Sequence, residues 1–345
     1  MSKINIKTST GCYDIFVEKN ALDRLKTLVD TRCVIVIDKK VYALWHEYLD
    51  STLDRLGIDY HITLVDGDEV NKNIDNVLYM YREFNKYGIT KCDYIVCIGG
   101  GVVGDMTAFA AATYLRGVEM IQVPTTLLSM VDSSIGGKSA IDMEFGKNLV
   151  GVIKAPHAVL IDSKFLDTLD RRQFATGMAE IVKSGLIGDS RILDEVEKSD
   201  ACIDRLIELS LGVKGGVVMR DEFETGERMV LNFGHTIGHA IEALGEYREY
   251  THGEAVSIGM YSALKLSERL LDMDSAITDR ILSLYAKYDM PHVNKYDVDS
   301  IMRYVVNDKK MRGGTINFVL IESVGKPNIM RLDIDALRTE LERLK

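Results

Sequence analysis

The first half of the chain alternates short β-branched runs with longer segments in which apolar residues recur about once per helical turn. The short runs predict strands at 33–38, 59–65, 94–98 and 119–123, and the periodic segments predict helices at 41–56, 74–87 and 105–115. Strands that alternate with helices at this spacing form parallel sheets. We therefore predict an α/β domain with a Rossmann-like parallel sheet, in which ligands lie at the carboxyl ends of the strands.

From residue 173 onward the helical pattern dominates. Helices are predicted at 177–186, 192–198, 201–219, 232–244, 254–271, 276–287 and 333–344, and a β-hairpin pairs 315–322 with 328–331. We place the domain boundary at residue 166. This gives an α/β nucleotide-binding domain over residues 1–166 and a mostly helical domain over residues 167–345, with a cleft between them.

Composition narrows the class of protein. The chain has 345 residues, of which 46% are hydrophobic and 27% charged, as in ordinary globular proteins. Its five cysteines are scattered and form no CxxC pair, which favours reduced thiols and a cytoplasmic location. The sequence shows no signal core and no apolar stretch long enough to span a bilayer. The net charge of −10 argues against a nucleic-acid partner, so we expect neither nucleic acid nor membrane among the partners.

Three of the seven histidines lie close together in the second half. His235 and His239 are four residues apart, so a helix would place both on one face, with Glu242 one turn further along. His252 follows a charged, tyrosine-rich loop. Two interpretations remain open on this pattern alone: ordinary helical histidines, or a metal site completed by a carboxylate from another segment.

Glycines follow the third predicted strand. Gly99, Gly101 and Gly104 satisfy the GxGxxG spacing, and glycines at the start of a helix let a phosphate approach free backbone N–H groups. The acidic residue that a dinucleotide site also requires is missing from the end of the next strand. A tight strand-to-helix turn is therefore nearly as good an interpretation. Thr125 and Thr126 follow the next strand, where their hydroxyls suit either a ribose and phosphate or a helix cap.

Lysines recur beside glycines and carboxylates. Lys138 and Lys147 end Gly-Gly-Lys and Gly-Lys sequences that we expect to be flexible turns, either on the surface or facing a pocket. Glu180 and Lys183 are three residues apart on a helix that is apolar on most sides. They could form a surface ion pair. Alternatively Glu180 is buried, and a buried carboxylate needs a partner such as a metal.

Together these residues indicate a metal site that receives an anionic substrate. One carboxylate and two imidazoles form a catalytic zinc set with an open position for substrate oxygens. The cationic side chains Lys214 and Arg228 near the histidines suit a phosphate or carboxylate.

Eight motifs occur in order along the chain: Gly-Gly-Gly-x-x-Gly-Asp, Pro-Thr-Thr, Asp-Ser-Ser-x-Gly-Gly-Lys, Gly-Lys-Asn-Leu, Gly-Met-Ala-Glu, Asp-Glu-x-Glu, Leu-Asn-Phe-Gly-His-Thr-x-Gly-His-Ala-Ile-Glu and His-Gly-Glu-Ala-Val-x-x-Gly-Met. With these motifs the chain resembles the 3-dehydroquinate synthase family, within the sugar phosphate cyclases, from about residue 38 through residue 310 and the final hairpin. It departs mildly before Gly-Met-Ala-Glu, where the family commonly has Asn or Ser and this chain has Thr176.

The resemblance implies an NAD-dependent and zinc- or cobalt-dependent lyase of the shikimate pathway. It would convert 3-deoxy-D-arabino-heptulosonate 7-phosphate to 3-dehydroquinate and phosphate. Glu180, His235 and His252 would bind the metal. His239 would contact the phosphate side and move a proton.

The resemblance also implies the remaining site residues and a homodimer. With His239, catalytic roles would fall to Lys138, Lys183, Lys214, Glu224 and Arg228, and substrate contacts to Arg116, Asp132, Lys147, Asn148, Asn232 and Lys310, with Lys309 an equal candidate for the last. Arg116 would reach the substrate phosphate of the neighbouring subunit. The NAD would be lined by Asp38, Asp66, Glu69, Lys72, Gly100, Gly101, Val102, Asp105, Thr125, Thr126, Lys138, Lys147, Phe165, Leu166, Asp167 and Thr168.

Three alternatives differ from this enzyme in substrate or in functional class. A related sugar-phosphate cyclase would act on sedoheptulose 7-phosphate or glucose 6-phosphate, which lack the carboxylate that Lys214 and Arg228 suit. A metal-dependent polyol dehydrogenase would share the glycine turn but release NADH in bulk. A non-catalytic binding protein would not need so many titratable residues.

Overall fold

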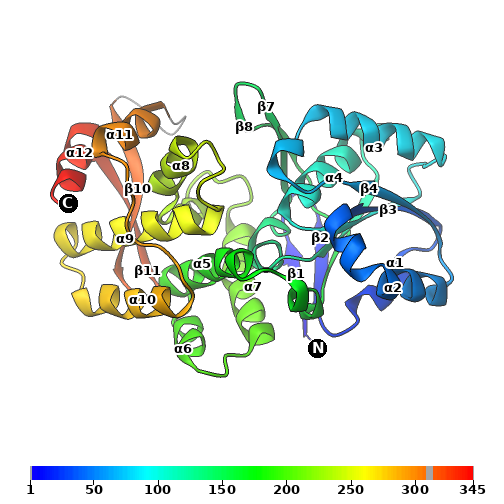
Figure 1. Ribbon diagram of the computed structural model, residues 1–345, viewed down its shortest axis with the longest axis horizontal. Helices are drawn as coiled ribbons and strands as arrows, with labels where there is room; N and C mark the ends of the chain where they lie inside the picture. Colours follow the sequence, from blue (N-terminus) through cyan, green and yellow to red (C-terminus); the bar gives the residue numbers. More distant parts are fainter. Residues whose placement is uncertain (1, 308–313, 345) are drawn as a thin grey trace. The chain divides into compact units, whose positions relative to one another are not determined.

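The computed structural model describes residues 2–307 and 314–344, and the chain divides into two compact units, residues 1–169 and 170–345 (Figure 1). The first unit is built on a seven-stranded sheet in the order β1-β2-β9-β6-β5-β3-β4. Its strands are β1 (Ser2–Lys7), β2 (Cys12–Val17), β3 (Arg32–Asp38), β4 (Asp59–Val65), β5 (Tyr94–Gly99), β6 (Glu119–Pro124) and β9 (Ala158–Ile161).

Strand β1 pairs antiparallel with β2, and the other neighbouring strands of the sheet pair in parallel. The predicted parallel sheet is therefore confirmed, and all four predicted strands are present to within one residue at either end. The sequence pattern did not predict β1, β2 and β9. Strand β1 alternates polar and apolar residues at an edge of the sheet, and β9 has only four residues. The alternation in β1 is the pattern of a half-buried strand and was available in the sequence, whereas the four residues of β9 are too few for a periodicity argument.

Successive side chains of a strand face opposite sides of the sheet, so the contacts of each side chain show which helices cover which face. In β3, Val34 and Val36 pack in one cluster with Met80 of α3 (Ile74–Lys86) and Met106 of α4 (Gly101–Thr113). Figure 1 shows α3 and α4 on one side of the sheet and α2 (Lys39–Leu56) on the other. The three predicted helices exist, but the start predicted for the third, at residue 105, is wrong. It begins at Gly101, inside the glycine run, because glycine can enter a helix directly from a tight turn.

The lysine-rich segment after the sheet is a β-hairpin. Strand β7 (Lys138–Met143) pairs antiparallel with β8 (Gly146–Ile153). The prediction that Lys138 and Lys147 lie on flexible turns is therefore wrong, since both are in paired strands. Glycines and lysines weaken the strand pattern in the sequence, and the pairing supplies the order that local propensity does not.

The second unit is mostly helical, as predicted. Its helices are α5 (Arg171–Ile187), α6 (Arg191–Glu197), α7 (Ile203–Arg220), α8 (His235–Leu244), α9 (His252–Leu270), α10 (Ser275–Lys287), α11 (Val298–Asn307) and α12 (Ile334–Glu342), with the hairpin β10 (Thr315–Ser323) and β11 (Lys326–Asp333). Figure 1 shows α9 in the middle of this unit, with α8, α10 and the hairpin around it. Helix α11 is the one of these helices that the sequence pattern did not predict.

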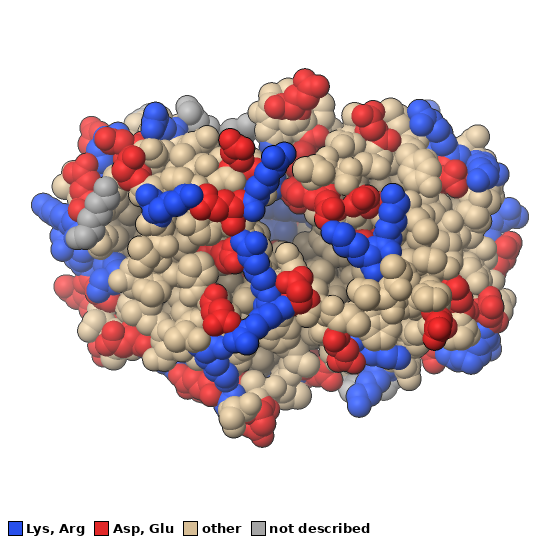
Figure 2. All heavy atoms as spheres, in the orientation of Figure 1, with Lys and Arg blue, Asp and Glu red and all other residues tan. Residues whose placement is uncertain are grey.

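Charged residues are spread over the surface. On the face drawn in Figure 2, acidic and basic side chains are interspersed among uncharged areas. Across the part of the chain that the structure describes, no helix combines the length and hydropathy required to cross a membrane.

Candidate active site

Glu180 lies in the middle of α5, in a stretch that is buried without interruption from Ala175 to Ile187. Its exposure is 1%, and that of Lys183, one turn later, is 2%. The Lys183 ammonium forms an ion pair with Glu180 Oε2. The surface ion pair that the spacing also allowed is therefore wrong. A carboxylate this deep needs compensation by cations or donors, because burial removes its hydration.

Two helix starts bring histidines to Glu180. His235 is the first residue of α8 and His252 the first residue of α9. The two helices approach closely where they cross, since a Cβ on Gly259 would lie only 2.0 Å from the carbonyl oxygen of Gly234. Glycine at this position therefore lets the imidazole rings of His235 and His252 lie with their centroids 5.2 Å apart.

The three side chains converge through one nitrogen or oxygen each. His235 Nε2 lies 3.6 Å and His252 Nε2 lies 3.5 Å from Glu180 Oε1. These separations are long for hydrogen bonds. They match a tetrahedral metal site, in which ligand atoms about 2.1 Å from the ion lie about 3.4 Å from one another. Ligand atoms of the three residues all lie within 4.8 Å of one another, so the set fits a zinc-like ion.

The other ring nitrogens of both histidines face acceptors. His235 Nδ1 lies 3.1 Å from the carbonyl oxygen of Phe233, and His252 Nδ1 lies 3.3 Å from Glu242 Oε2. A neutral imidazole carries one proton, and an acceptor beside Nδ1 draws that proton to Nδ1. Each Nε2 then directs a lone pair toward the carboxylate of Glu180. Such an arrangement requires a cation between them, either a proton or a metal.

Electrostatics of the cluster agree with this geometry. Burial, together with the nearby Lys183 ammonium, holds the pKa of His235 well below its ordinary value. Burial would also lower the pKa of His252, but the carboxylates of Glu242 and Glu180 outweigh it and raise that pKa well above its usual range. Burial would raise the pKa of Glu180, yet Lys183 and His252 hold it below the ordinary value. The cluster therefore favours an ionised carboxylate beside positive charge.

His239 lies next to this set and differs from its members mainly in exposure. Its ring centroid lies 5.3 Å from that of His235 and 6.3 Å from that of His252, and its side chain is exposed. It can share a ligand group with Glu242 and His252, whereas the buried group is made by Glu180 with His235 and His252. The structure thus offers two candidate ligand groups that share His252, one with His235 and Glu180 and one with His239 and Glu242. Glu242 is a contact that the sequence-based site did not include, although its place one turn after His239 was the available signal.

Two cationic residues that precede His235 in the sequence are also buried. Lys214 of α7 is 8% exposed, and Arg228, on the short helical turn Glu227–Asn232, is 3% exposed. The Arg228 guanidinium donates to the carbonyl oxygen of Glu222. Lysine and arginine side chains usually lie at the surface, and these two do not. A buried guanidinium or ammonium group requires dedicated partners.

Asp221 organises the loop that leads to Arg228. Its carboxylate accepts hydrogen bonds from the backbone N–H groups of Thr225 at 2.9 Å, Gly226 at 2.8 Å and Arg228 at 2.9 Å. Glu224 within this loop has a left-handed backbone (φ 59°), and its carboxylate accepts a hydrogen bond from Asn232 Nδ2. Sequence reasoning missed Asp221, because its role depends on a loop fold that no periodicity predicts.

In the first unit, the glycine run ends β5 and begins α4. Gly100 is the N-cap of α4 and no side chain caps that helix end, which leaves room for an anion at the N-terminal N–H groups. The backbone N–H of Thr125 donates to the carbonyl oxygen of Gly99 at 3.0 Å. Thr126 exchanges hydrogen bonds with Ser129, as a turn-capping residue does. The Thr125 hydroxyl is buried and lacks a hydrogen-bond partner among residues 2–307 and 314–344.

A polar cluster surrounds Lys72, which is 5% exposed. Its ammonium lies 2.6 Å from Asp105 Oδ2 and donates to Asn148 Oδ1 at 2.6 Å. Asp142 completes the cluster, since its backbone N–H donates to the Lys72 carbonyl and its carboxylate accepts from the Asn148 N–H. Asp142 was missed because only the register of the hairpin brings it here.

Other predicted residues lie at different places in the first unit. Lys147 pairs with Glu69 at 2.6 Å, Asp38 caps α2, and Thr168 accepts a hydrogen bond from Trp45 Nε1 at 2.9 Å. Lys138 and Arg116 are exposed and Asp132 is half-buried. Asp66, Val102, Phe165, Leu166 and Asp167 lie on the segments that follow β4, β5 and β9. Lys309 and Lys310 lie outside the described residues.

Comparisons with known proteins agree over nearly the whole chain. Residues 61–176 match the 3-dehydroquinate synthase N-terminal family and residues 177–311 the corresponding C-terminal family. The chain is 40% identical over 337 residues to 3-dehydroquinate synthase of Clostridium acetobutylicum, covering 94% of this chain and 95% of the relative. It is 39% identical over 353 residues to the Streptococcus pneumoniae enzyme of that name, covering 98% and 99%.

A solved structure shares the fold. A 2-deoxy-scyllo-inosose synthase complexed with carbaglucose-6-phosphate, NAD+ and Co2+ aligns with a TM-score of 0.88 and 27% identity, covering 99% of this chain and 100% of that chain. The family matches together span well over half of the chain, and the relatives exceed 30% identity over almost all of it. The chain therefore belongs to the 3-dehydroquinate synthase family.

Proposed function

We propose that the chain converts 3-deoxy-D-arabino-heptulosonate 7-phosphate to 3-dehydroquinate and phosphate, with a divalent metal and catalytic NAD. The observation that carries this proposal is the convergence of His235 and His252 on the buried carboxylate of Glu180 in a chain of this family. The carboxylate and imidazole donors suit zinc or cobalt. When bound, such an ion polarises substrate oxygens and lowers the pKa of a hydroxyl group.

The cations of the second unit would hold the anionic substrate. Lys183 is already paired with Glu180, so it can neutralise that carboxylate while its remaining N–H groups donate to the substrate. Lys214 and Arg228 are buried cations that suit the carboxylate of the substrate, and the planar fork of Arg228 can bind it with two parallel hydrogen bonds. Glu224 and Asn232, bonded to each other, would orient hydroxyl groups.

His239 would move protons on the phosphate side. Its exposed imidazole lies outside the Glu180 set, and an imidazole can donate or accept a proton there as a general acid or base. Lys138, Lys147, Asn148 and Asp132 of the first unit would contribute further substrate contacts, and Lys310 or Lys309 would add one from outside the described residues.

The first unit would bind NAD at the carboxyl ends of its parallel strands, as the topology favours. When bound there, NAD would supply reversible hydride transfer with a substrate alcohol. Gly100, Gly101 and Val102 would offer backbone N–H groups to the pyrophosphate, and Asp105 and Lys72 a charged pair beside it. Asp38, Asp66, Glu69, Thr125, Thr126 and the segment 165–168 would line the remainder.

We also propose the wider setting of the enzyme. Residues 1–166 would form the NAD-binding domain and residues 167–345 the metal- and substrate-binding domain. The functional form would be a homodimer, because an exposed Arg116 on a turn with left-handed backbone (φ 64°) is suited to reach out of its own subunit. The five free cysteines fit a reducing, cytoplasmic compartment.

Phosphate release tests the proposed reaction. The purified chain is incubated with the heptulosonate phosphate, zinc and NAD far below the substrate concentration. Many phosphates released per NAD, without accumulation of NADH, is the expected result. Parallel reactions with sedoheptulose 7-phosphate and glucose 6-phosphate test the related cyclases, and NADH accumulation with polyols tests a dehydrogenase. Release that stops at one phosphate per NAD contradicts the proposal.

A further inference from the structure

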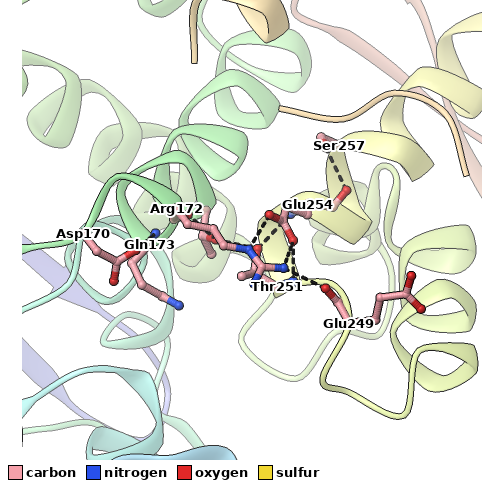
Figure 3. Close-up of polar contacts among 8 residues, drawn as sticks. Asp170, Arg172, Gln173, Glu249, Thr251, Glu254 and Ser257 are labelled. Atoms are coloured by element: carbon pink, nitrogen blue, oxygen red, sulfur yellow. Dashed lines mark hydrogen bonds and ion pairs between the residues drawn. The ribbon is translucent and has the colours of Figure 1, made fainter. Parts of the chain in front are cut away.

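Polar contacts join the start of α9 to α5, the helix that carries Glu180 (Figure 3). Thr251 and Glu254 form a reciprocal capping box at the start of α9, with Glu254 Oε2 accepting the Thr251 N–H at 2.8 Å. Arg172 of α5 binds both carboxylate oxygens of Glu254 at 2.6 Å and also donates to the carbonyl oxygen of Glu249. The N-terminus of α9 is thus attached to α5 by side chains of both helices.

Thr176 makes the contact nearest to the proposed metal ligands. It is 2% exposed, and its hydroxyl oxygen lies 2.7 Å from Thr251 Oγ1 and 3.0 Å from the carbonyl oxygen of Arg172. Thr176 precedes Glu180 by one helical turn on α5, and Thr251 directly precedes His252. This single hydrogen bond between hydroxyls therefore connects the backbone segments that hold Glu180 and His252.

The backbones of the two segments are also in direct contact there. A Cβ on Gly253 would lie 2.4 Å from the Cα and 2.5 Å from the carbonyl oxygen of Thr176. Only glycine permits this approach without displacement of one helix. The hydroxyl contact and the backbone contact together set the depth at which α9 sits against α5.

We infer that Thr176 is a positioning residue for the metal site: its hydroxyl, bound to Thr251, fixes the separation between Glu180 and His252. The inference rests on the proposed function, in which these two residues bind the metal. Metal sites require ligand positions within a few tenths of an ångström. A shift of α9 along α5 would move His252 Nε2 away from its place 3.5 Å from Glu180 Oε1. Substitution of a residue that holds the ligands in place commonly changes metal affinity about 10- to 100-fold.

The ion pair between Arg172 and Glu254 serves a different purpose. The Arg172 side chain is 52% exposed, so water and salt screen its charge. Its partner Glu254 stabilises the first turn of α9 through the capping box and the helix dipole. This pair supports the helix end, whereas the buried hydroxyl contact sets its position. The two contributions can be separated by substitution.

The test measures zinc affinity of the metal-free full chain by competition with a chromogenic chelator. Thr176→Val keeps the shape of the side chain and removes the hydroxyl, and Thr176→Ser keeps the hydroxyl. We expect a dissociation constant about tenfold higher for Thr176→Val and within about twofold of the wild type for Thr176→Ser. Thr176→Ala replaces the valine variant should that variant not fold. The melting temperature of each metal-free variant is recorded alongside.

Three reference results decide the outcome. Unchanged zinc affinity in Thr176→Val, with zinc binding lost in His252→Ala, overturns the inference and leaves the proposed metal site standing. Unchanged zinc binding in His252→Ala overturns the ligand assignment itself. An increase in the dissociation constant for Arg172→Met as large as that for Thr176→Val also overturns the inference, because general loosening of α9 would then explain both.

Discussion

The polar clusters around Glu180 and around Lys72 differ in how their charges are compensated. Glu180 and Lys183 are 1% and 2% exposed, and the Nε2 atoms of His235 and His252 lie 3.6 Å and 3.5 Å from Glu180 Oε1. In the first unit the Lys72 ammonium is buried but already engaged by Asp105 and Asn148. Lys147 and Glu69 beside it are 24% and 35% exposed.

The two clusters therefore prepare a binding site in different ways. Around Glu180 one carboxylate oxygen is paired with the Lys183 ammonium, while the other faces His235 and His252 at distances that suit a bound ion, so the folded chain presents ligand atoms before any ion arrives. Around Lys72 the charges neutralise one another, and an anionic ligand has to exchange places with an existing carboxylate or amide partner. We therefore expect substitutions around Glu180 to have large effects on metal binding and stability, and those around Lys147 to have small effects.

The largest expected effect separates two histidines on the same helix. His235→Ala removes one of three proposed ligands, so bound zinc should be lost on dialysis and turnover abolished. His239→Ala should retain stoichiometric zinc while kcat falls about 10²- to 10⁴-fold, the usual contribution of a general acid or base. Metal content by atomic absorption and kcat by phosphate release measure the two results. Equal zinc loss in both variants would mean that His239 is also a ligand.

A smaller effect compares the lysines of the two clusters. Lys183→Met leaves the Glu180 carboxylate buried without its ammonium, and in metal-free protein this should reduce the free energy of unfolding by about 3–5 kcal/mol. Lys147→Met removes a half-exposed partner of Glu69 and should cost no more than about 1 kcal/mol. Urea unfolding of both metal-free variants gives the comparison. Similar losses in the two variants would show that burial does not distinguish the clusters.

Much of the fold could be predicted from the sequence, because its strongest signals are local. Strands such as β3 and helices such as α2 and α3 carry regular apolar patterns, and the alternation of strands with helices specified a parallel sheet. The hairpin of β7 and β8 could not be predicted, since its glycines and lysines form strands only through pairing with each other. Helix α11 and the edge strand β1 were missed for lack of a distinct boundary signal.

The candidate site was predicted as a set of residues more than as a geometry. The spacing of His235 and His239 located the region, but helix periodicity pairs these two residues and cannot pair His235 with His252 or Glu180, which come from other helices. Contacts made through tertiary structure were missed for the same reason, as with Asp142 beside Lys72 and Asp221 beneath Arg228. Thr176 was noticed as a departure from the family, and its contact with Thr251 became apparent only in the structure.

The smallest expected effect concerns Asp221, at the margin of the buried cluster. Burial would raise the pKa of its carboxyl, but the backbone N–H groups of Thr225, Arg228 and Gly226 outweigh this and lower the pKa to about 2, from an ordinary value of 3.8. A carboxyl group whose pKa is lower in the folded state stabilises that state above its unfolded pKa. The contribution is lost as the pH falls through the folded pKa.

Asp221→Asn should therefore lower stability by about 1 kcal/mol at neutral pH, a modest value because the carboxylate is only half-buried. The difference from the wild type should stay constant between pH 7 and pH 5 and should diminish below about pH 4, where unfolded-state aspartates take up protons. Thermal unfolding of both proteins across this range measures it. A difference that instead grew on acidification would show that another carboxyl group holds the loop, and the Arg228 backbone would then owe its position to contacts other than Asp221.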